Sequence, residues 1–226
     1  MKIGIIIAIE RELRSFLNNG SEIETLAVGR KTVYRTHLGG HEVLAMLSGY
    51  GEIDASAATQ LLITWGGCEA MLNFGVTGAL DPALRVEDLF VVRRVCHYDY
   101  DVSPIDPVKK HQYEEFPDEF IPLDDGLLRR AKELMPELRE AAVASGDRFI
   151  EARSDKESLR ALGCDICDME IAAIARVCAL NGIPCLSVKC ISDTYDGTGA
   201  DFVKNVTSSA QKAFQVLVRL IEGLPA

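Results

Sequence analysis

Positive charge is scarce in this sequence of 226 residues. Its 24 Lys and Arg side chains are outnumbered by 34 Asp and Glu, which gives a formal net charge of −10. Such a chain repels phosphate backbones and anionic lipid unless a local basic patch overrides its charge. Short basic pairs occur at Arg93-Arg94 and Lys109-Lys110, and pairs this short are typical of solvated surface. We therefore expect neither nucleic acid nor a membrane as a partner.

Long apolar runs are also missing. The apolar opening at residues 3–9 meets Glu10-Arg11-Glu12 with no small-residue cleavage site after it, which predicts a buried strand rather than a signal peptide. No other segment approaches the roughly 20 uncharged apolar residues that a membrane-spanning helix needs. We therefore expect a cytoplasmic protein.

The cysteines do not form a recognisable metal or redox motif. The segment Cys164-Asp165-Ile166-Cys167 matches C-x-x-C, but no second pair stands at zinc-finger spacing and the thioredoxin-like context is missing. The seven cysteines are an odd number, and most lie inside apolar runs. This usage is typical of reduced thiols buried in a core.

Two other patterns are incomplete as cofactor or metal sites. In Gly49-Tyr50-Gly51 the third glycine of a dinucleotide fingerprint is missing, because position 54 is aspartate. His97, Asp99 and Asp101 alternate as a strand would, which would place all three on one face. We expect them to form a polar edge at a cleft mouth or a subunit contact rather than a metal site, so no metal and no cofactor are predicted.

Apolar runs rich in β-branched residues alternate with helical patterns, as in βαβ construction. Strands are predicted at 3–9, 43–47, 69–74, 89–96, 141–145 and 184–191, and helices at 10–18, 54–65, 125–135, 155–161, 169–180 and 201–222. The composition, 48% hydrophobic and 26% charged, fits one domain spanning 1–226. We predict a single α/β domain with a mixed, mostly parallel central sheet flanked by helices.

Two stretches depart from the alternation. At 22–48, short strands separated by Gly29 and by Gly39-Gly40 predict an antiparallel meander that extends the sheet or closes it toward a barrel. At 98–122, a stretch rich in Pro, Asp, Tyr and Glu predicts a long loop. Loops of this length are usually lids or binding segments, and a disordered excursion is the alternative.

Polar residues follow several of the predicted strands, at the edge where ligands bind in open α/β sheets. Acidic side chains that converge on one cleft are costly unless they bind cations, polyols or protonatable groups. The segments that follow strong apolar runs are Ile9-Glu10-Arg11-Glu12, Asn73-Phe74-Gly75-Val76-Thr77-Gly78, Ser145-Gly146-Asp147-Arg148-Phe149-Ile150, Asp168-Met169-Glu170 and Ile191-Ser192-Asp193.

In their order and spacing, these segments resemble the methylthioadenosine/S-adenosylhomocysteine nucleosidase group of the purine nucleoside phosphorylase superfamily. The resemblance covers nearly the whole chain and implies a nucleoside phosphorylase-like fold. It also implies hydrolysis of the N-ribosidic bond of a purine nucleoside, such as 5′-methylthioadenosine or S-adenosylhomocysteine, with release of adenine. A homodimer is implied as well, in which the 98–122 loop of one subunit helps to close its neighbour's site.

The resemblance assigns the catalytic roles to Asp193 and Glu12. Cleaving an N-ribosidic bond requires a protonated leaving base and an attacking water, and two carboxyl groups can supply both. Asp193 would protonate the purine N7, while Glu12 would deprotonate the water and stabilise the oxocarbenium-like ribose. Helix capping or a turn could explain either residue taken singly, but the segments as a set favour the site.

A substrate site is implied around these carboxyl groups. Glu170 would accept hydrogen bonds from the ribose hydroxyls, and Met169 would pack against the sugar. The Ile150 backbone would bind the purine edge, and Phe149 would stack on the base. Core packing is the alternative for Phe149 and Met169. The other expected substrate-binding residues are Ile9, Tyr50, Val76, Gly78 and Ser192.

The sequence departs from the superfamily at positions that bear on the reaction. Phosphorylases hold phosphate with arginines and a serine, where this chain has Glu12, Asn73 and Val76, and a carboxylate repels phosphate. Hydrolysis is therefore favoured, with a phosphorylase and a non-catalytic nucleoside-binding module as alternatives. Tyr50 is bulkier than the small aliphatic residues that the nucleosidases have near this turn, and the loop segment 102–106 lacks their usual phenylalanine. Val76 stands where the nucleosidases typically have a serine. We expect an altered 5′ site.

Overall fold

The computed structural model describes residues 1–19 and 22–225. Its strands are β1 (Lys2–Ile7), β2 (Glu24–Val28), β3 (Lys31–Leu38), β4 (His41–Leu47), β5 (Ala70–Ala79), β6 (Leu89–His97), β7 (Ile121–Pro122), β8 (Arg139–Ser145), β9 (Ile166–Asp168) and β10 (Cys185–Asp193). Its helices are α1 (Glu10–Leu17), α2 (Glu52–Thr64), α3 (Asp125–Leu134), α4 (Arg153–Ala161), α5 (Ile171–Asn181) and α6 (Gly199–Gly223). The predicted alternation of strands and helices is confirmed.

The strands form one mixed sheet in the order β10-β6-β8-β9-β5-β1-β4-β3-β2, with β7 beside β6. Because β10 pairs with β5 in parallel as well as with β6 in antiparallel, the strands β5, β10, β6, β8 and β9 close into a barrel. The antiparallel β2, β3 and β4 extend the open part of the sheet beside β1. The predicted α/β fold, with its partly barrel-like sheet and its meander, is therefore confirmed.

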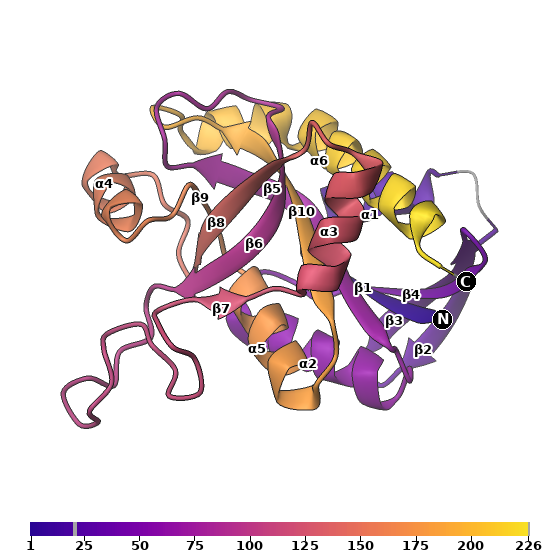
Figure 1. Cartoon of the computed structure of the whole chain (residues 1–226). Helices are drawn as coiled ribbons and strands as arrows, with labels where there is room; N and C mark the ends of the chain where they lie inside the picture. Colours follow the sequence, from indigo (N-terminus) through magenta and orange to yellow (C-terminus); the bar gives the residue numbers. More distant parts are fainter. Residues whose placement is uncertain (20–21, 226) are drawn as a thin grey trace.

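Helices cover both sides of this sheet (Figure 1). The pair α2 and α5 lies on one side, and α1, α3 and α6 lie on the other. On the α6 side, Phe214 packs against Phe16 of α1 and Phe74 of β5, with ring centroids 5.9 and 5.0 Å apart. In the described part of the chain, no helix combines the length and apolar character needed to cross a bilayer.

Most element boundaries differ from the sequence prediction by one to a few residues, and three differences bear on the site. The strand expected at 69–74 continues to Ala79, because pairing with β10 carries the ladder past the glycines at 75 and 78. The three-residue β9 was not predicted, since a strand this short has no periodicity of its own. The helix expected from 169 begins at Ile171, which leaves Glu170 at its N-cap position.

The loop predicted at 98–122 is present, apart from the short β7 at its end. Its aromatic side chains anchor it, since the rings of Tyr100 and Tyr113 stack with centroids 4.2 Å apart, and the Tyr113 hydroxyl lies 2.8 Å from His97 Nδ1. The expected alternation of His97, Asp99 and Asp101 on one strand face is wrong, because β6 ends at His97. Asp99 Oδ1 lies 2.9 Å from His97 Nε2, whereas Asp101 accepts hydrogen bonds from Ser103.

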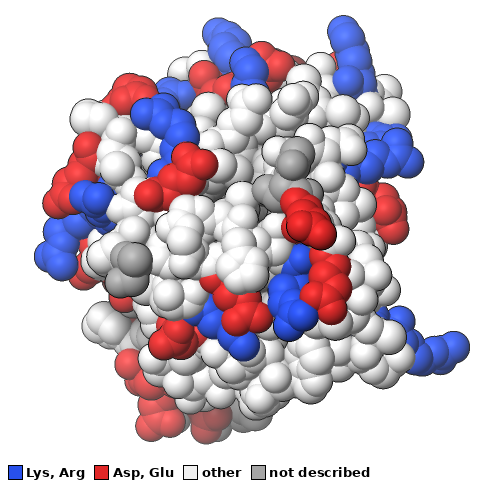
Figure 2. Space-filling model, turned by 90° about the vertical axis from the view of Figure 1, so that its right-hand side faces the viewer, with Lys and Arg blue, Asp and Glu red and all other residues white. Residues whose placement is uncertain are grey.

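Charged side chains of both signs are interspersed on the face drawn in Figure 2, which presents no extended patch of one sign. All seven cysteines are buried free thiols. Among residues 1–19 and 22–225, no group of three or more His, Cys, Asp or Glu is arranged to hold a metal ion.

Candidate active site

A cavity of about 460 Å³ opens beside the carboxyl ends of β1, β5, β9 and β10. It brings together nearly all the residues predicted for the site: Ile9, Glu12, Tyr50, Val76, Gly78, Phe149, Met169, Glu170, Ser192 and Asp193. Ile150 is the exception, because it lines a smaller hollow of about 240 Å³ whose walls include Gly78 and Asp193. The sequence therefore located the cavity, and the strand ends assemble it from segments far apart in the chain.

Glu12 projects from the first turn of α1 and is only 3% exposed. Its Oε2 accepts hydrogen bonds from the backbone N–H groups of Ala8 and Ile9, both at 3.2 Å, and its Oε1 accepts one from Val76 N–H at 2.9 Å. Glu12 therefore does cap the start of α1, and its carboxylate also accepts a hydrogen bond from β5. Burial raises the pKa of Glu12, and Lys189 and these three N–H donors oppose the shift only in part.

Asp193 ends β10 and is 2% exposed. Its Oδ1 accepts a hydrogen bond from the Ser192 hydroxyl at 2.8 Å. Burial raises the pKa of Asp193, against the opposing effects of that hydroxyl and of the Lys156 ammonium. The geometry therefore favours a carboxyl group that retains its proton to higher pH than an exposed aspartate does.

Two glycines of β5 allow these carboxyl groups to approach the strand. A Cβ at Gly75 would lie 2.4 Å from Glu12 Oε1, and a Cβ at Gly78 would lie 2.9 Å from Asp193 Oδ2. Both distances are shorter than real Cβ contacts, so a side chain at either position would displace the facing carboxyl group. Because a strand rises about 3.3 Å per residue, the two carboxyl groups lie against positions roughly 10 Å apart along β5, with the cavity between them.

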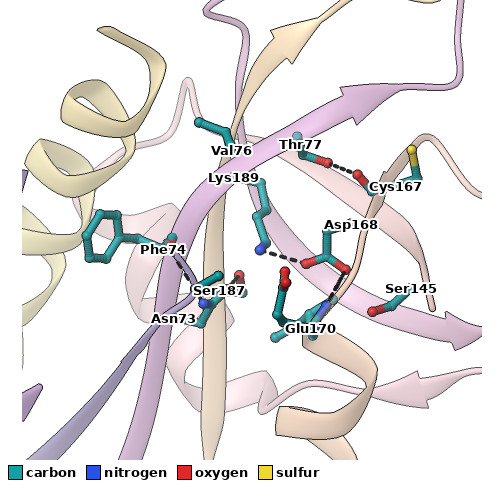
Figure 3. Close-up of polar contacts among 12 residues, drawn as sticks. Asn73, Phe74, Val76, Thr77, Ser145, Cys167, Asp168, Glu170, Ser187 and Lys189 are labelled. Atoms are coloured by element: carbon teal, nitrogen blue, oxygen red, sulfur yellow. Dashed lines mark hydrogen bonds and ion pairs between the residues drawn. The ribbon is translucent and has the colours of Figure 1, made fainter. Parts of the chain in front are cut away.

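A buried cation lies behind this cavity (Figure 3). Lys189 points from β10 toward Asp168, and its Nζ lies 2.6 Å from Asp168 Oδ2, with both side chains no more than 3% exposed. Burial acts to lower the pKa of Lys189, but Asp168, Glu170 and Glu12 together raise it above its ordinary value. Lys189 is therefore a buried positive charge that interacts favourably with three carboxylates.

Glu170 is held at the junction of two helices. Its Oε1 accepts a hydrogen bond from Gly51 N–H at the start of α2, at 3.1 Å. In return, Glu52 of α2 accepts hydrogen bonds from Ala173 N–H in the first turn of α5 and from the Ser145 hydroxyl. Burial and the nearby Asp168 raise the pKa of Glu170, and burial raises the pKa of Glu52 to about 9. Each helix start is thus capped by a carboxyl group from the other.

Aromatic side chains form the outer wall. Phe149 is 46% exposed, and its ring meets Phe202 of α6 edge to face, with centroids 5.7 Å apart. Tyr50 is 65% exposed at the turn before α2. The core-packing alternative for Phe149 is therefore wrong, because a core side chain would be covered. An exposed ring at a cavity mouth is available to a flat ligand.

A family model described as the phosphorylase superfamily matches residues 2–222. This chain belongs to the phosphorylase superfamily. An aminodeoxyfutalosine nucleosidase from Campylobacter jejuni is 29% identical over 234 aligned positions, which cover 99% of this chain and 100% of that protein. A 5′-methylthioadenosine/S-adenosylhomocysteine nucleosidase from Tolumonas auensis is 33% identical over 200 positions, which cover 85% of this chain and 86% of that one.

The likeness to this part of the superfamily extends to three dimensions. The crystal structure of a Helicobacter pylori 5′-methylthioadenosine/S-adenosylhomocysteine nucleosidase superposes with a TM-score of 0.93 at 28% identity, and covers 99% of each chain. That enzyme was crystallised with a pyrrolopyrimidine-bearing ligand. These relatives are nucleosidases, and the chain is accordingly a phosphorylase-superfamily N-glycosidase that acts as a hydrolase on a purine nucleoside.

Sequence reasoning missed several residues around the site of this superfamily member. Lys189 carried a signal, because a lysine inside an otherwise apolar strand must find a buried partner. Glu52 and Phe202 carried none, since a charged first turn and an apolar helix position are ordinary surface and core features. The further lining residues are Ala8, Thr77, Cys167, Asp168 and Phe202.

Proposed function

We propose that this nucleosidase hydrolyses 5′-methylthioadenosine or S-adenosylhomocysteine and releases adenine. The observation that carries the proposal is the charge of the cavity wall. Among the described residues that line it, the charged side chains are the carboxyl groups of Glu12, Asp168, Glu170 and Asp193, with no Lys or Arg. A phosphate anion would meet repulsion from this wall, whereas water and a cationic ribose would be favoured.

Asp193 is the proposed general acid. Its buried position and raised pKa support a protonated carboxyl group that can donate to the purine N7. Protonation makes the base a better leaving group, so the bond between N9 and the ribose C1′ can break before the nucleophile has bonded. The Ser192 hydroxyl fixes the orientation of the carboxyl group.

Glu12 is the proposed general base. Its three backbone N–H partners hold the carboxylate in one orientation at the cavity wall, where it takes a proton from the attacking water. As the ribose gains oxocarbenium character, the negative charge of Glu12 also stabilises it. The raised pKa of this buried carboxylate makes it a stronger base than an exposed glutamate.

The remaining residues are proposed to hold the nucleoside between these two groups. Glu170 accepts hydrogen bonds from the ribose hydroxyls, and Met169 packs against the sugar. Phe149 stacks on the purine, and the Ile150 backbone binds its edge from the adjoining hollow, whose walls include Asp193. Ile9, Tyr50, Val76, Gly78 and Ser192 complete the contacts.

A homodimer is proposed as the active form, with the loop at 98–122 near the partner's site. Large apolar side chains exposed on the single chain support it, with Ile53 and Ile105 each 82% exposed. Sedimentation of the purified protein at micromolar concentration tests this. A species of monomer mass alone would rule it out.

The reaction is tested by base release from methylthioadenosine, S-adenosylhomocysteine, adenosine and inosine, each with and without phosphate. Adenine release without phosphate supports hydrolysis, and the free sugar, which is 5-methylthioribose from methylthioadenosine, should accompany it in place of the sugar 1-phosphate. Release only with phosphate would make the chain a phosphorylase. Tight nucleoside binding without release in either condition would make it a binding module.

A further inference from the structure

The segment that follows Asp193 is a tight turn packed against the end of β10. The Gly197 N–H group donates to the Thr194 carbonyl at 2.9 Å. A Cβ at Gly197 would lie 2.8 Å from Thr194 N and 3.3 Å from Asp193 Cβ. Because the turn folds back onto the strand end so closely, a displacement of the turn would also displace the Asp193 carboxyl group.

Two side chains of α4 hold this turn, one from the interior and one from the surface. In the interior, Lys156 Nζ donates hydrogen bonds to the carbonyls of Thr194 and Tyr195, each at 3.0 Å. At the surface, the Arg153 guanidinium forms an ion pair with Asp196. The helix α4 is therefore attached to the two residues that directly follow Asp193.

Lys156 is a fully buried lysine, with 0% of its surface exposed. Within the part of the chain that the structure describes it forms no ion pair, whereas the buried Lys189 pairs with Asp168. A buried ammonium is costly unless a negative charge compensates it. The two carbonyls accept its hydrogen bonds but carry no formal charge. A carboxyl group on which its positive charge does act is that of Asp193, whose pKa it lowers.

We propose that Lys156 is a positioning residue for the general acid, which holds the turn after Asp193 in place and stabilises the aspartate anion formed during the reaction. The proposal rests on the proposed function, which makes Asp193 the proton donor. In that step the Asp193 O–H bond breaks and a bond from the proton to the purine N7 forms. The bond between N9 and C1′ breaks, and its electron pair passes to the base. Negative charge thus develops on Asp193 in the transition state, where a preorganised ammonium stabilises it.

Burial and Lys156 act on Asp193 in opposite directions. Burial raises the pKa of Asp193, which retains the proton until the nucleoside binds, whereas Lys156 lowers that pKa, which helps the carboxyl group to release the proton. Two further carboxylates, those of Glu151 and Asp201, raise the pKa. The other titratable groups near Asp193 or on the walls of the same cavity are Glu12, Cys167, Asp168 and Glu170.

The test measures kcat and KM for adenine release from methylthioadenosine, as a function of pH, in Lys156→Met and Lys156→Gln. Methionine removes the charge and both hydrogen bonds, whereas glutamine removes the charge and retains an N–H donor. We expect both variants to lower kcat by about 10- to 100-fold, because the anion of Asp193 loses its stabilising charge. KM should change little, since Lys156 lines neither the cavity nor the hollow that adjoins it.

The pH profile distinguishes this role from a structural one. Without Lys156 the pKa of Asp193 should rise, so the basic limb of kcat/KM should move to higher pH in both variants. Lys156→Gln carries the test if Lys156→Met does not fold. A variant with a lower Tm but the basic limb of the wild type would overturn the proposal, because Lys156 would then only stabilise the fold.

Lys132→Met is the matched control. Lys132 lies in the last turn of α3, and its Nζ also donates to two backbone carbonyls, those of Pro136 and Leu138. It lines neither the cavity nor the adjoining hollow. The control variant should therefore lower Tm and leave kcat and the basic limb as they are.

A double variant separates this proposal from the proposed function. The side chain of Asp193→Asn has no carboxyl proton to release, so adding Lys156→Gln to it should lower the residual rate little further. A further drop as large as that in the wild-type background would overturn the proposal, since Lys156 would then act through another group. Full activity of Asp193→Asn alone would instead contradict the general acid of the proposed function.

Discussion

Lys189→Met removes the buried cation that interacts with Asp168, Glu170 and Glu12. The methionine side chain has a similar length and fits an apolar strand, so the change is mainly one of charge. Without the ammonium, Asp168 loses its ion-pair partner at 2.6 Å, and both side chains of that pair are no more than 3% exposed. An uncompensated buried carboxylate is among the costliest defects that a single substitution creates.

The size of the effect follows from this burial. Breaking a buried ion pair by removing one partner costs about 3–5 kcal/mol. For a chain of this length, each kcal/mol lowers Tm by about 2–4 °C, so a loss of about 6–20 °C is expected. Lys189 also lowers the pKa of both Glu12 and Glu170. Its removal should therefore raise both pKa values further.

Thermal unfolding and the pH dependence of kcat/KM measure the two effects. A general base must be ionised, so a higher pKa of Glu12 moves the acidic limb of the profile to higher pH. Lys212→Met is the matched control, because Lys212 pairs with Glu87 at the surface, and it should cost at most about 1 kcal/mol. Asp168→Asn combined with Lys189→Met should recover much of the stability. A single variant with unchanged Tm and unchanged profile would refute the assignment of a buried charge to Lys189.

Three further predictions concern the carboxyl groups. Asp193→Asn should lower the rate of base release by about 100- to 10,000-fold with nucleoside affinity largely retained, measured by steady-state kinetics and calorimetry; full activity would refute the general acid. Gly75→Ala should displace Glu12, whose Oε1 would lie 2.4 Å from the new Cβ, and it should lower both kcat and Tm; wild-type activity would contradict the close approach. Between 4.5 and about 9, the ordinary and folded pKa values of Glu52, the folded chain holds a proton that the unfolded chain releases. The free energy of unfolding should therefore fall as pH rises, by up to about 1.4 kcal/mol per pH unit. Glu52→Gln should flatten that slope in urea titrations, and an unaltered slope would argue against a raised Glu52 pKa.

The alternation of strands and helices was predictable because buried parallel strands are apolar along their whole length. Ends of elements were less predictable. The strand at 69–74 was expected to stop before its glycines, but those glycines face carboxyl groups and not solvent. A glycine usually signals a turn in sequence, and here it signals a close approach that only the assembled barrel creates.

The cavity residues were predictable as a set, because their segments resemble one family in order and spacing. The buried ion pair behind them, between Lys189 and Asp168, was not predictable from the sequence. Whether Lys189 reaches Asp168 depends on the register between β10 and β5 and on the position of β9, and neither is encoded in any local pattern. The capping of α2 by Glu170 depends likewise on helices that are 119 positions apart in sequence at their contact.

The cluster also relates the stability of this fold to its chemistry. Burial raises the pKa values of Glu12, Glu52, Glu170 and Asp193 alike. The charge of Asp168 raises the pKa values of Glu52 and Glu170 as well. A surface site would avoid this cost, but an exposed aspartate could not keep its proton near neutral pH. The barrel stabilises the charged form of Glu12 more than that of Asp193. Glu12 accepts three backbone N–H hydrogen bonds and lies in the field of Lys189, which favour its charge, whereas Asp193 has one hydroxyl donor and the field of Lys156. In the proposed mechanism, that difference in environment separates a base from an acid built from the same functional group.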